Sequence, residues 1–354
     1  MLSIGIPKEI MPGEGRVALV PEDCAQLVTA GCALHLQSKA GLASGYPDTA
    51  YIAVGVRVQA TAAKLYQAAD LVVKVKQPLA ADLELLEARH TLFSFLHLAA
   101  DPALVKHLTA IGLTAIPFEA VSSTGGFPLL APMSAIAGRL AVLRGASLLF
   151  SEAGSGVLLG GVDGSEPGRV VVLGAGVAGS HAAAVALALQ AEVHLFDLNA
   201  ERLAALQQRW QRLHIHSATA DVIAEYAEQA DLVIGAVMLA GRRAPVVLKQ
   251  SSIARMRPGS AIVDIAIDQG GCIEGIRATA ADSPVYRHLD VLHSAVPNMP
   301  GAVPRTAAQS LSAVIRPYVQ QLASAPLAQL PALKRAIAIQ AGAVVDPVLL
   351  QVLG

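Results

Sequence analysis

The sequence predicts an α/β fold built from two doubly wound parallel sheets, one in each of two domains. Short apolar runs alternate with amphipathic stretches along almost the whole chain, and this alternation is typical of parallel strands connected by helices. With 354 residues the chain is too long for one ordinary core. A glycine-rich turn at residues 174–179 lies near the middle of the chain and marks a domain that we expect to be inserted in the other.

The expected strands fall into two sets, on either side of residue 150. The first set comprises residues 2–6, 33–38, 71–76, 92–96 and 113–117, and the second comprises residues 170–174, 192–197, 231–236, 261–265 and 289–293. Helices are expected at residues 21–30, 61–69, 101–110 and 133–150. A second long helix is expected to begin at Thr306, because Thr306-Ala-Ala-Gln309 fits a capping box directly after Pro304.

These elements place a nucleotide-binding domain at residues 133–302. The segments 1–132 and 303–354 are expected to fold together as a discontinuous substrate domain. The Gly/Pro-rich segment Gly154–Gly168 is expected to form a hinge or linker. Because the chain must cross twice between the domains, we expect a cleft between them.

The segment VVVLGAGVAGSHAAAVALALQAEVHLFD at residues 170–197 predicts a dinucleotide site. Gly174 permits the tight turn, Gly176 lets a pyrophosphate approach the backbone, and Gly179 lets the helix pack on the strand. The amides of the helix N-terminus face the anion. Asp197 is expected to bind the adenosine ribose hydroxyls and to repel a 2′-phosphate, which favours NAD over NADP. Strand, loop, helix, strand and acid in this order predict a Rossmann domain; a glycine-rich turn in an ordinary β–α unit is the alternative.

The composition bears on membrane association and assembly. Charged residues make up 15% of the chain, against about 25% in a typical soluble protein, and the mean hydropathy is +0.52. The longest uncharged run, Val170–Ala191, is long enough to cross a bilayer, but it is the strand-loop-helix unit just described. We therefore expect no membrane span. Low charge with much Ala, Val and Leu favours burial of surface in a homo-oligomer.

Charge and cysteine content indicate the partners and the compartment. A net charge of −1 and the absence of Lys/Arg clusters argue against nucleic acid or an anionic membrane as a partner. The N-terminal MLSIGIPKEI lacks the apolar core of a signal peptide. Cys24, Cys32 and Cys272 are odd in number and lack metal-ligand spacing, so we expect reduced thiols, a cytoplasmic protein and no metal site.

Two lysines and a histidine stand near the ends of expected strands. Lys74 and Lys76 are expected on one face of the strand at 71–76, because side chains alternate along a strand. Either the strand end reaches solvent there, or the strand places a cationic side chain at the sheet edge where α/β proteins bind ligands. His97 ends a similar apolar run. It is the best general acid/base candidate, with a satisfied core histidine as the alternative.

Three further polar residues lie in loops rich in Gly or Pro. Arg16 follows Gly13-Glu-Gly and suits bidentate capture of a substrate carboxylate, or is a surface arginine. Asp268 precedes a glycine pair that gives its loop freedom to approach a ligand, whereas Asp264 is interpreted as a structural residue within the strand. Asn298 either hydrogen-bonds a carboxamide or shapes its turn.

Together these residues resemble the bacterial alanine dehydrogenases, which share ancestry with the NAD-binding subunit of proton-translocating transhydrogenase. The resemblance covers nearly the whole chain and is carried by several blocks in the same order: IGIPKEI at 4–10, Arg16-Val-Ala, Lys74-Val-Lys76, Leu96-His97-Leu-Ala-Ala, Pro128-Leu-Leu-Ala-Pro-Met-Ser134, the glycine loop, Asp231-Leu-Val-Ile-Gly235, Asp264-Ile-Ala-Ile-Asp268-Gln-Gly-Gly and Asn298-Met-Pro-Gly-Ala-Val-Pro-Arg305.

The resemblance implies NAD-dependent, reversible oxidative deamination of L-alanine to pyruvate and ammonium. Arg16 and Lys76 would hold the substrate carboxylate and keto oxygen, and His97 would be the acid/base. Asp268 would position ammonia or water and support proton transfer. The residues implied to contact the cofactor are Ser134, Asp197, Asp268 and Asn298. A hexamer and cleft closure on NAD binding are also implied.

Three positions depart from the family pattern and leave the substrate open. Gln77 stands where the family commonly has Glu, Ala135 replaces the acid of the usual Met-Ser-Glu, and Phe118 stands where many members have Tyr. They motivate a second hypothesis, a dehydrogenase of another small amino or imino acid. A transhydrogenase-like hydride-exchanging module and an NAD-binding sensor without turnover are the third and fourth hypotheses.

Overall fold

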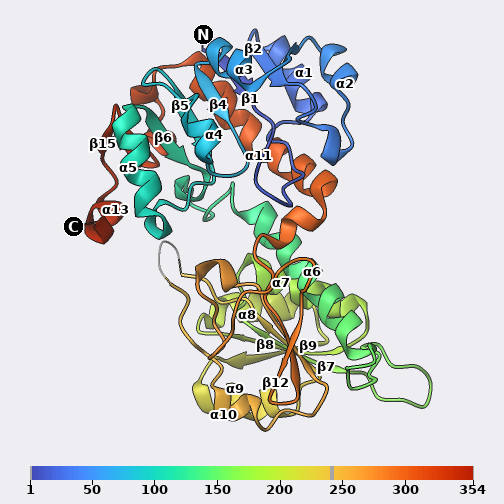
Figure 1. Cartoon of the computed structure of the whole chain (residues 1–354). Coiled ribbons are helices and arrows are strands. Elements are labelled where there is room, and N and C mark those ends of the chain that lie inside the picture. The colour runs from blue at the N-terminus through green and yellow to red at the C-terminus, as the bar shows by residue number, and fades with distance from the viewer. Residues whose placement is uncertain (1, 240–242, 354) are drawn as a thin grey trace. The chain divides into compact units, whose positions relative to one another are not determined.

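The chain folds into two α/β units. The computed structural model describes residues 2–239 and 243–353. The first unit comprises Met1–Met133 and Gly301–Gly354, and the inserted unit comprises Ser134–Pro300. Each unit has one mostly parallel sheet with helices, which confirms the predicted fold class (Figure 1). Among the described residues, no helix has the length and apolarity needed to cross a membrane.

The sheet of the first unit has the strand order β15-β14-β6-β5-β4-β1-β2-β3. Its strands are β1 (Ser3–Ile6), β2 (Ala33–Gln37), β3 (Arg57–Gln59), β4 (Leu71–Val73), β5 (Thr91–Ser94), β6 (Thr114–Pro117), β14 (Ile339–Gln340) and β15 (Ala343–Val344). All neighbouring strands from β6 to β3 pair in parallel, and only β14 and β15 add antiparallel pairs. The carboxyl ends of β1, β4, β5 and β6 therefore share one sheet edge.

The helices of the first unit come from both segments of the chain. They are α1 (Pro21–Thr29), α2 (Asp48–Ile52), α3 (Ala62–Ala68), α4 (Ala80–Leu83), α5 (Pro102–Ile111), α11 (Pro304–Ser324), α12 (Pro331–Arg335) and α13 (Pro347–Leu353), with short 3-10 helices η1 (Leu42–Ser44), η2 (Leu98–Ala100), η3 (Phe118–Ala120) and η6 (Leu327–Gln329). Figure 1 shows α11 in orange beside the blue N-terminal elements. Asp23 of α1 accepts hydrogen bonds from Ser312 (2.6 Å) and Arg316 (3.1 Å) of α11, which joins the two segments.

The inserted unit has a seven-stranded sheet in the order β12-β13-β11-β10-β7-β8-β9. Its strands are β7 (Arg169–Leu173), β8 (Glu192–Asp197), β9 (Leu213–Ser217), β10 (Leu232–Gly235), β11 (Ala261–Asp264), β12 (Tyr286–His288) and β13 (Val291–Ser294), and only β12 is antiparallel. The chain runs from β7 outward to β9 and then returns to β10 on the other side of β7. This reversal of strand order creates the switch point where α/β sheets bind ligands.

Helices cover both faces of the inserted sheet. They are α6 (Ala131–Leu149), α7 (Val177–Ala188), α8 (Ala200–Arg209), α9 (Ala220–Glu228) and α10 (Gln250–Ile253), with η4 (Ile267–Gln269) and η5 (Met299–Ala302) in loops. Val170 and Val172 of β7 pack in one core cluster with residues of α6 and α7, while Val171 and Leu173 pack in another with residues of α9. Burial on both faces explains why residues 170–173 of β7 are all apolar instead of alternating with polar residues.

Several predicted boundaries were wrong. The strand at 71–76 ends at Val73, the strand at 92–96 ends at Ser94, and Asp264 ends its strand instead of lying within it. Helix α11 begins at Pro304 without a side-chain cap, so the predicted capping box at Thr306 is absent. Pro at the first helical position needs no hydrogen-bonded N–H, and it sets this start two residues earlier than the sequence pattern predicted.

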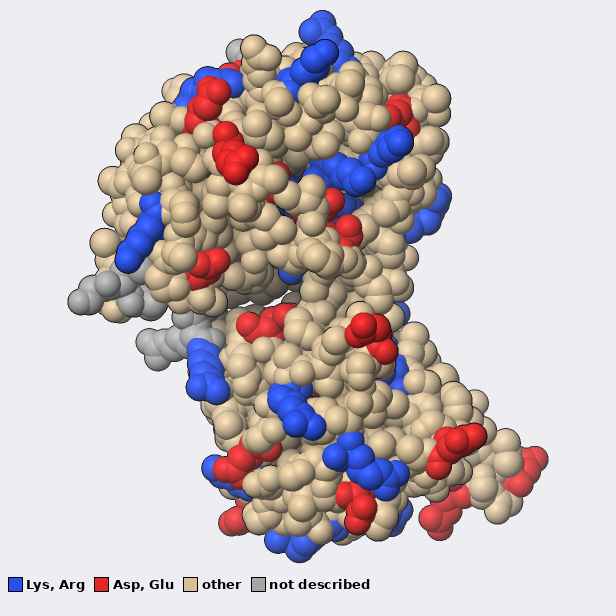
Figure 2. Space-filling model, viewed as in Figure 1, with Lys and Arg blue, Asp and Glu red and all other residues tan. Residues whose placement is uncertain are grey.

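Figure 2 shows isolated charges of both signs on the visible surface of each unit, separated by uncharged residues. This distribution agrees with the low charge content of the chain, and the face in view carries no extended field of one sign.

Candidate active site

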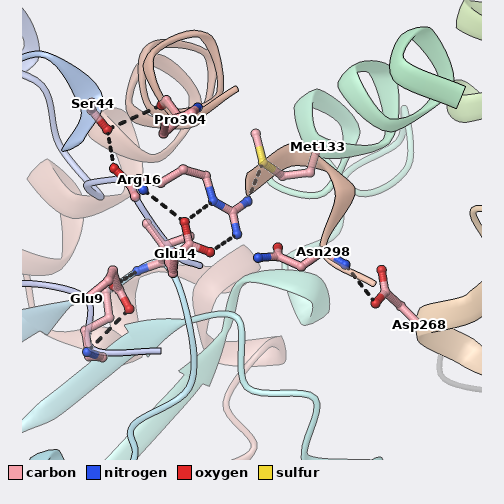
Figure 3. A network of polar contacts seen from close by, with 11 residues as sticks. Glu9, Glu14, Arg16, Ser44, Met133, Asp268, Asn298 and Pro304 are labelled. Carbon is pink, nitrogen blue, oxygen red and sulfur yellow. Dashed lines mark hydrogen bonds and ion pairs between the residues drawn. The ribbon is translucent and has the colours of Figure 1, made fainter. Parts of the chain in front are cut away.

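Arg16 lies in the loop after β1 and is held by a glutamate that the sequence pattern did not indicate. The Glu14 Oε1 atom accepts hydrogen bonds from the Arg16 backbone N–H (2.9 Å) and from its Nε (2.7 Å), and Oε2 pairs with a terminal guanidinium nitrogen (Figure 3). The other terminal nitrogen lies 3.1 Å from the sulfur of Met133. Only 3% of Arg16 is exposed, so the interpretation as a surface arginine was wrong.

The two lysines after β4 occupy different environments. The Lys74 ammonium is buried, 3.5 Å from a Glu9 oxygen and 3.2 Å from an Asp82 oxygen. Burial raises the pKa of Glu9, and Lys74 opposes that shift. Since β4 ends at Val73, the prediction that both lysines project from one strand face was wrong. Lys74 forms a buried ion cluster, while Lys76 lies half-buried two residues further along the loop.

The loop that carries Lys76 is tied to Glu9 of the first unit's N-terminal segment. The second Glu9 carboxylate oxygen accepts a hydrogen bond of 2.7 Å from the Val75 backbone N–H, between the two lysines. Tyr66 donates a hydrogen bond of 2.8 Å to Asp82, which completes the cluster around Lys74. The buried carboxylates therefore fix the backbone immediately before Lys76.

His97 follows β5 in a left-handed backbone conformation, with φ of 49°. Its side chain is 46% exposed, so the interpretation as a satisfied core histidine was wrong. Glu119 accepts hydrogen bonds from the Leu96 N–H (3.2 Å) and the His97 N–H (2.6 Å), and its Oε1 lies 3.9 Å from His97 Nδ1. Glu119 follows β6, the parallel neighbour of β5, and sequence reasoning missed it.

An aromatic cluster supports the His97 loop. The Phe95 ring is parallel to the His97 ring at 6.1 Å, and Phe118 meets Phe95 edge-on at 5.1 Å and Phe93 edge-on at 4.5 Å. Phe118 is fully buried. Because position 118 holds Phe and not Tyr, this buried core contains no hydroxyl at that position.

The glycine loop of the inserted unit has the geometry that a pyrophosphate needs. Gly174 turns the chain after β7 with φ of +101°, and Gly176 precedes the first residue of α7. A Cβ on Gly179 would lie 1.7 Å from the Gly174 carbonyl oxygen, so α7 packs there only without a side chain. A Cβ on Gly176 would meet nothing within 4 Å. The space over Gly176 is therefore open for a ligand to approach the backbone.

Asp197 ends β8 beside this loop. Its Oδ2 accepts a hydrogen bond of 2.7 Å from the Ala175 N–H, in the glycine loop itself, and its Oδ1 accepts one of 2.8 Å from Asn199. Arg202 of α8 pairs with Asp197 at 3.4 Å. The carboxylate thus supports the loop backbone and stands where the second strand of a dinucleotide fold presents its acid.

The remaining cofactor candidates lie in loops of the same unit. Asp268 is in η4 after β11, and its Oδ1 accepts a hydrogen bond from the Asn298 N–H at 3.3 Å (Figure 3). Asn298 follows β13 and has φ of 54°. Ser134 lies half-buried in the first turn of α6.

The topology brings the candidates together within each unit. Arg16, Lys76 and His97 follow β1, β4 and β5, which are adjacent strands of the first sheet. In the inserted sheet the glycine loop follows β7, Asp197 ends β8, and Asp268 and Asn298 follow β11 and β13, all at its carboxyl edge. Within the described ranges, no group of three or more His, Cys, Asp or Glu residues is arranged to hold a metal ion.

A glycine loop at the switch point of one sheet, and cations with an imidazole after adjacent strands of another, are typical of two-domain dinucleotide-dependent enzymes. Residues 5–137 match the alanine dehydrogenase/PNT N-terminal domain, and residues 141–347 match the alanine dehydrogenase/PNT C-terminal domain. The chain belongs to the alanine dehydrogenase/PNT family. Membership of this family implies that the protein uses a nicotinamide cofactor.

Individual relatives agree with this assignment. Alanine dehydrogenase of Halomonas elongata is 45% identical over 91% of this chain and 88% of its own length, and that of Mycobacterium tuberculosis is 41% identical over 98% and 95%. A solved L-alanine dehydrogenase superposes with a TM-score of 0.95 at 44% identity, covering 99% of this chain and 98% of that one. A transhydrogenase from Sinorhizobium meliloti follows with a TM-score of 0.83 at 27% identity, over 97% and 99%.

Proposed function

We propose that this protein is an NAD-dependent L-alanine dehydrogenase that converts L-alanine reversibly to pyruvate and ammonium. The observation that carries the proposal is the grouping of Arg16, Lys76 and His97 at the carboxyl ends of adjacent strands, in a chain with an intact glycine loop. Identity above 40% to several alanine dehydrogenases over most of the chain supports it.

The residues present fit NAD. The open space over Gly176 suits a pyrophosphate, and Asp197 suits the adenosine ribose hydroxyls and disfavours a 2′-phosphate. Ser134, Asp268 and Asn298 are the further residues that we propose to contact the cofactor. When bound, NAD accepts a hydride from the substrate Cα. The protein's own residues do the remaining work of binding and proton transfer.

Each step of the chemistry has a residue suited to it. Arg16, which Glu14 holds in place, binds the substrate carboxylate, since a guanidinium presents paired donors to it. Lys76 donates to the oxygen that becomes the keto group. His97 takes and returns protons as water adds to the imine and ammonia leaves, and Asp268 orients the water or ammonia. Closure of the domains on NAD binding stays a prediction.

The reverse reaction tests the proposal. Purified protein with NADH, pyruvate and ammonium should oxidise NADH and form alanine, and each of the three substrates should be required. His97→Ala should lower kcat by roughly 10²–10⁴-fold, which is the usual contribution of a general acid/base, while the Kd for NADH stays at the wild-type value. Near-normal kcat in that variant would reject the role of His97, and NADH binding without turnover in the wild type would favour a sensor.

The comparisons favour alanine dehydrogenation over hydride exchange between cofactors. The transhydrogenase superposes less closely than the L-alanine dehydrogenase, and this chain retains Lys76 and His97, which cofactor-to-cofactor hydride exchange does not need. Another small amino or imino acid as the preferred substrate stays the alternative that Gln77, Phe118 and Ala135 motivate.

We also propose a cytoplasmic homo-oligomer, with a hexamer as the expected state. The three cysteines are buried and unpaired, which suits a reducing compartment. The inserted unit exposes large apolar side chains that an assembly would cover, namely Leu143, Phe150, Leu158 and Val162. Light scattering on the eluting protein should give six times the mass of one chain, and a monomer mass would reject this proposal.

A further inference from the structure

Asp264 is a fully buried carboxylate for which the proposed reaction has no role. It is the last residue of β11, between β10 and β13 in the inserted sheet. A buried charge is costly unless hydrogen bonds compensate it, so its partners indicate what it does.

Those partners are three backbone N–H groups at the two ends of one loop. Oδ1 accepts a hydrogen bond from Ala266 (2.8 Å), and Oδ2 accepts hydrogen bonds from Cys272 (2.8 Å) and Ile273 (3.2 Å). Asp268 lies between these ends, in η4. The carboxylate therefore joins the start of the Asp268 loop to its finish.

The chain around this carboxylate is shaped to fit it closely. Gly271 has φ of +77°, and a Cβ there would lie 2.3 Å from the Ile276 Cγ2 atom and 3.0 Å from Oδ2. On the neighbouring strand β10, a Cβ on Gly235 would lie 3.0 Å from Oδ1 and 2.7 Å from the Cys272 sulfur. Glycine at both positions lets the loop close over the charge, because any side chain would displace it.

The charge state of Asp264 affects the loop, because the three backbone groups that contact its carboxylate are all hydrogen-bond donors. Burial raises its pKa to about 6, while the three N–H groups oppose that shift. The ionisable side chains that interact with it in the described residues are the Cys272 thiol, 3.7 Å from Oδ1, and Tyr286 of β12; Arg243 lies against the same loop at Gly270. Because the closed loop raises this pKa, it binds a proton more tightly than the open loop does, so opening of the loop should become rarer as the pH falls through about 6.

We propose that Asp264 is a positioning residue that holds the loop of residues 265–273 so that Asp268 meets the substrate and cofactor. The inference rests on the proposed function, through the role of Asp268. Asp264, which the sequence pattern indicated only as a structural residue, would thus contribute to the reaction through Asp268.

The test is a double-mutant cycle in the full-length protein. Asp264→Asn keeps the shape of the side chain but removes the charge and places an amide NH₂ against backbone donors. Its kcat for pyruvate and ammonium should fall on the order of 100-fold, the effect of misplacing a reacting group by about 1 Å. If Asp264 acts through Asp268, the double variant Asp264→Asn/Asp268→Asn should be no slower than Asp268→Asn alone.

The matched control is Asp231→Asn at the opposite end of the same sheet. Asp231 is also buried and accepts a backbone hydrogen bond, from Arg169 at 2.8 Å, but it precedes β10. Its loss should leave kcat within about threefold of wild type, the usual range for sites that do not share partners with the reaction. Asp264→Asn behaving like this control, or losses that multiply in the double variant, would overturn the inference. A wild type without alanine-forming activity would instead reject the proposed function.

A second measurement covers the case in which Asp264→Asn fails to fold. Amide hydrogen exchange of the wild type reports on the Cys272 and Ile273 N–H groups directly. After correction for intrinsic rates, their protection should be high at about pH 7.5 and about tenfold higher at about pH 5, because a carboxyl whose pKa is raised from 3.8 to about 6 binds its proton more tightly in the closed loop than in the open one. Equal protection at both values would overturn the inference.

Discussion

Adding one methyl group at each of two glycines in the segment 174–179 should destabilise the fold at only one of them but weaken cofactor binding at both. In Gly179→Ala the new Cβ would lie 1.7 Å from the Gly174 carbonyl oxygen and 2.9 Å from its carbon. Cβ contacts below 3.0 Å essentially never occur, so α7 must move away from the turn by about 1.3 Å (3.0 minus 1.7). Overpacking of this kind costs typically ~1–3 kcal/mol. A unit of this size loses about 2–4 °C of Tm per kcal/mol.

The same movement carries the α7 amides away from the pyrophosphate. Losing one hydrogen bond to a charged group costs about 1.5–3 kcal/mol, so the Kd for NADH should rise by about 10- to 150-fold. Gly176→Ala has no clash within 4 Å and an ordinary φ of −66°, so its Tm should stay within about 2 °C of wild type. Its methyl group would nevertheless occupy the space over the backbone, and its Kd should rise by at least the same factor.

Calorimetry and NADH fluorescence titration measure the two effects separately, with Ser180→Ala on α7 as the control. The Ser180 hydroxyl donates to the Val177 carbonyl within its own helix, so both readings of this variant should match wild type. Wild-type Tm in Gly179→Ala, or wild-type NADH affinity in Gly176→Ala, would refute the reasoning about this loop.

Three further predictions concern other charges of the structure. Asp197→Ala should shift the ratio of kcat/KM for NAD over NADP by at least about tenfold toward NADP, because the acid that repels the 2′-phosphate is gone; an unchanged ratio in steady-state assays would refute that role. Lys74→Ala should lower the free energy of unfolding by about 3–5 kcal/mol in urea, since it leaves Glu9 and Asp82 buried without their cation, and a loss below about 1 kcal/mol would contradict the buried cluster. Burial lowers the pKa of His293 from 6.5 to about 4, so the folded chain resists a proton that the unfolded chain accepts. The stability that His293 contributes should therefore decline as pH falls from 6.5 to about 4, by on the order of 3 kcal/mol, and His293→Gln should lack that decline in urea titrations across this range.

Prediction of the structure from the sequence was most accurate where several residues within a short stretch serve one function. Gly174, Gly176, Gly179 and Asp197 lie within one β–α–β unit, and their spacing alone predicted the turn, the helix and the second strand. The two units and their parallel sheets followed from the alternation of apolar and amphipathic segments. Strand lengths were less predictable, because Lys74 follows a three-residue strand and lies buried beside Asp82 and beside Glu9, which is far from it in the sequence.

The sequence did not indicate Glu14 or Glu119, and it indicated Asp264 only as a structural residue, although all three carboxylates hold loops of the site. Glu14, Glu119 and Asp264 act largely on backbone N–H groups, and such acceptors have no partner that a sequence pattern can show. Glu119 reaches His97 only because β5 and β6 are parallel neighbours. The antiparallel strands β12, β14 and β15 were also missed, because runs of two or three residues are too short to show a periodicity.

A steady-state screen of amino acids with NAD tests the central claim most directly. L-Alanine should give the highest kcat/KM, with pyruvate and ammonium as products and with larger side chains reacting more slowly. A bulkier amino acid as the best substrate, or no amino acid reducing NAD at all, would contradict the account.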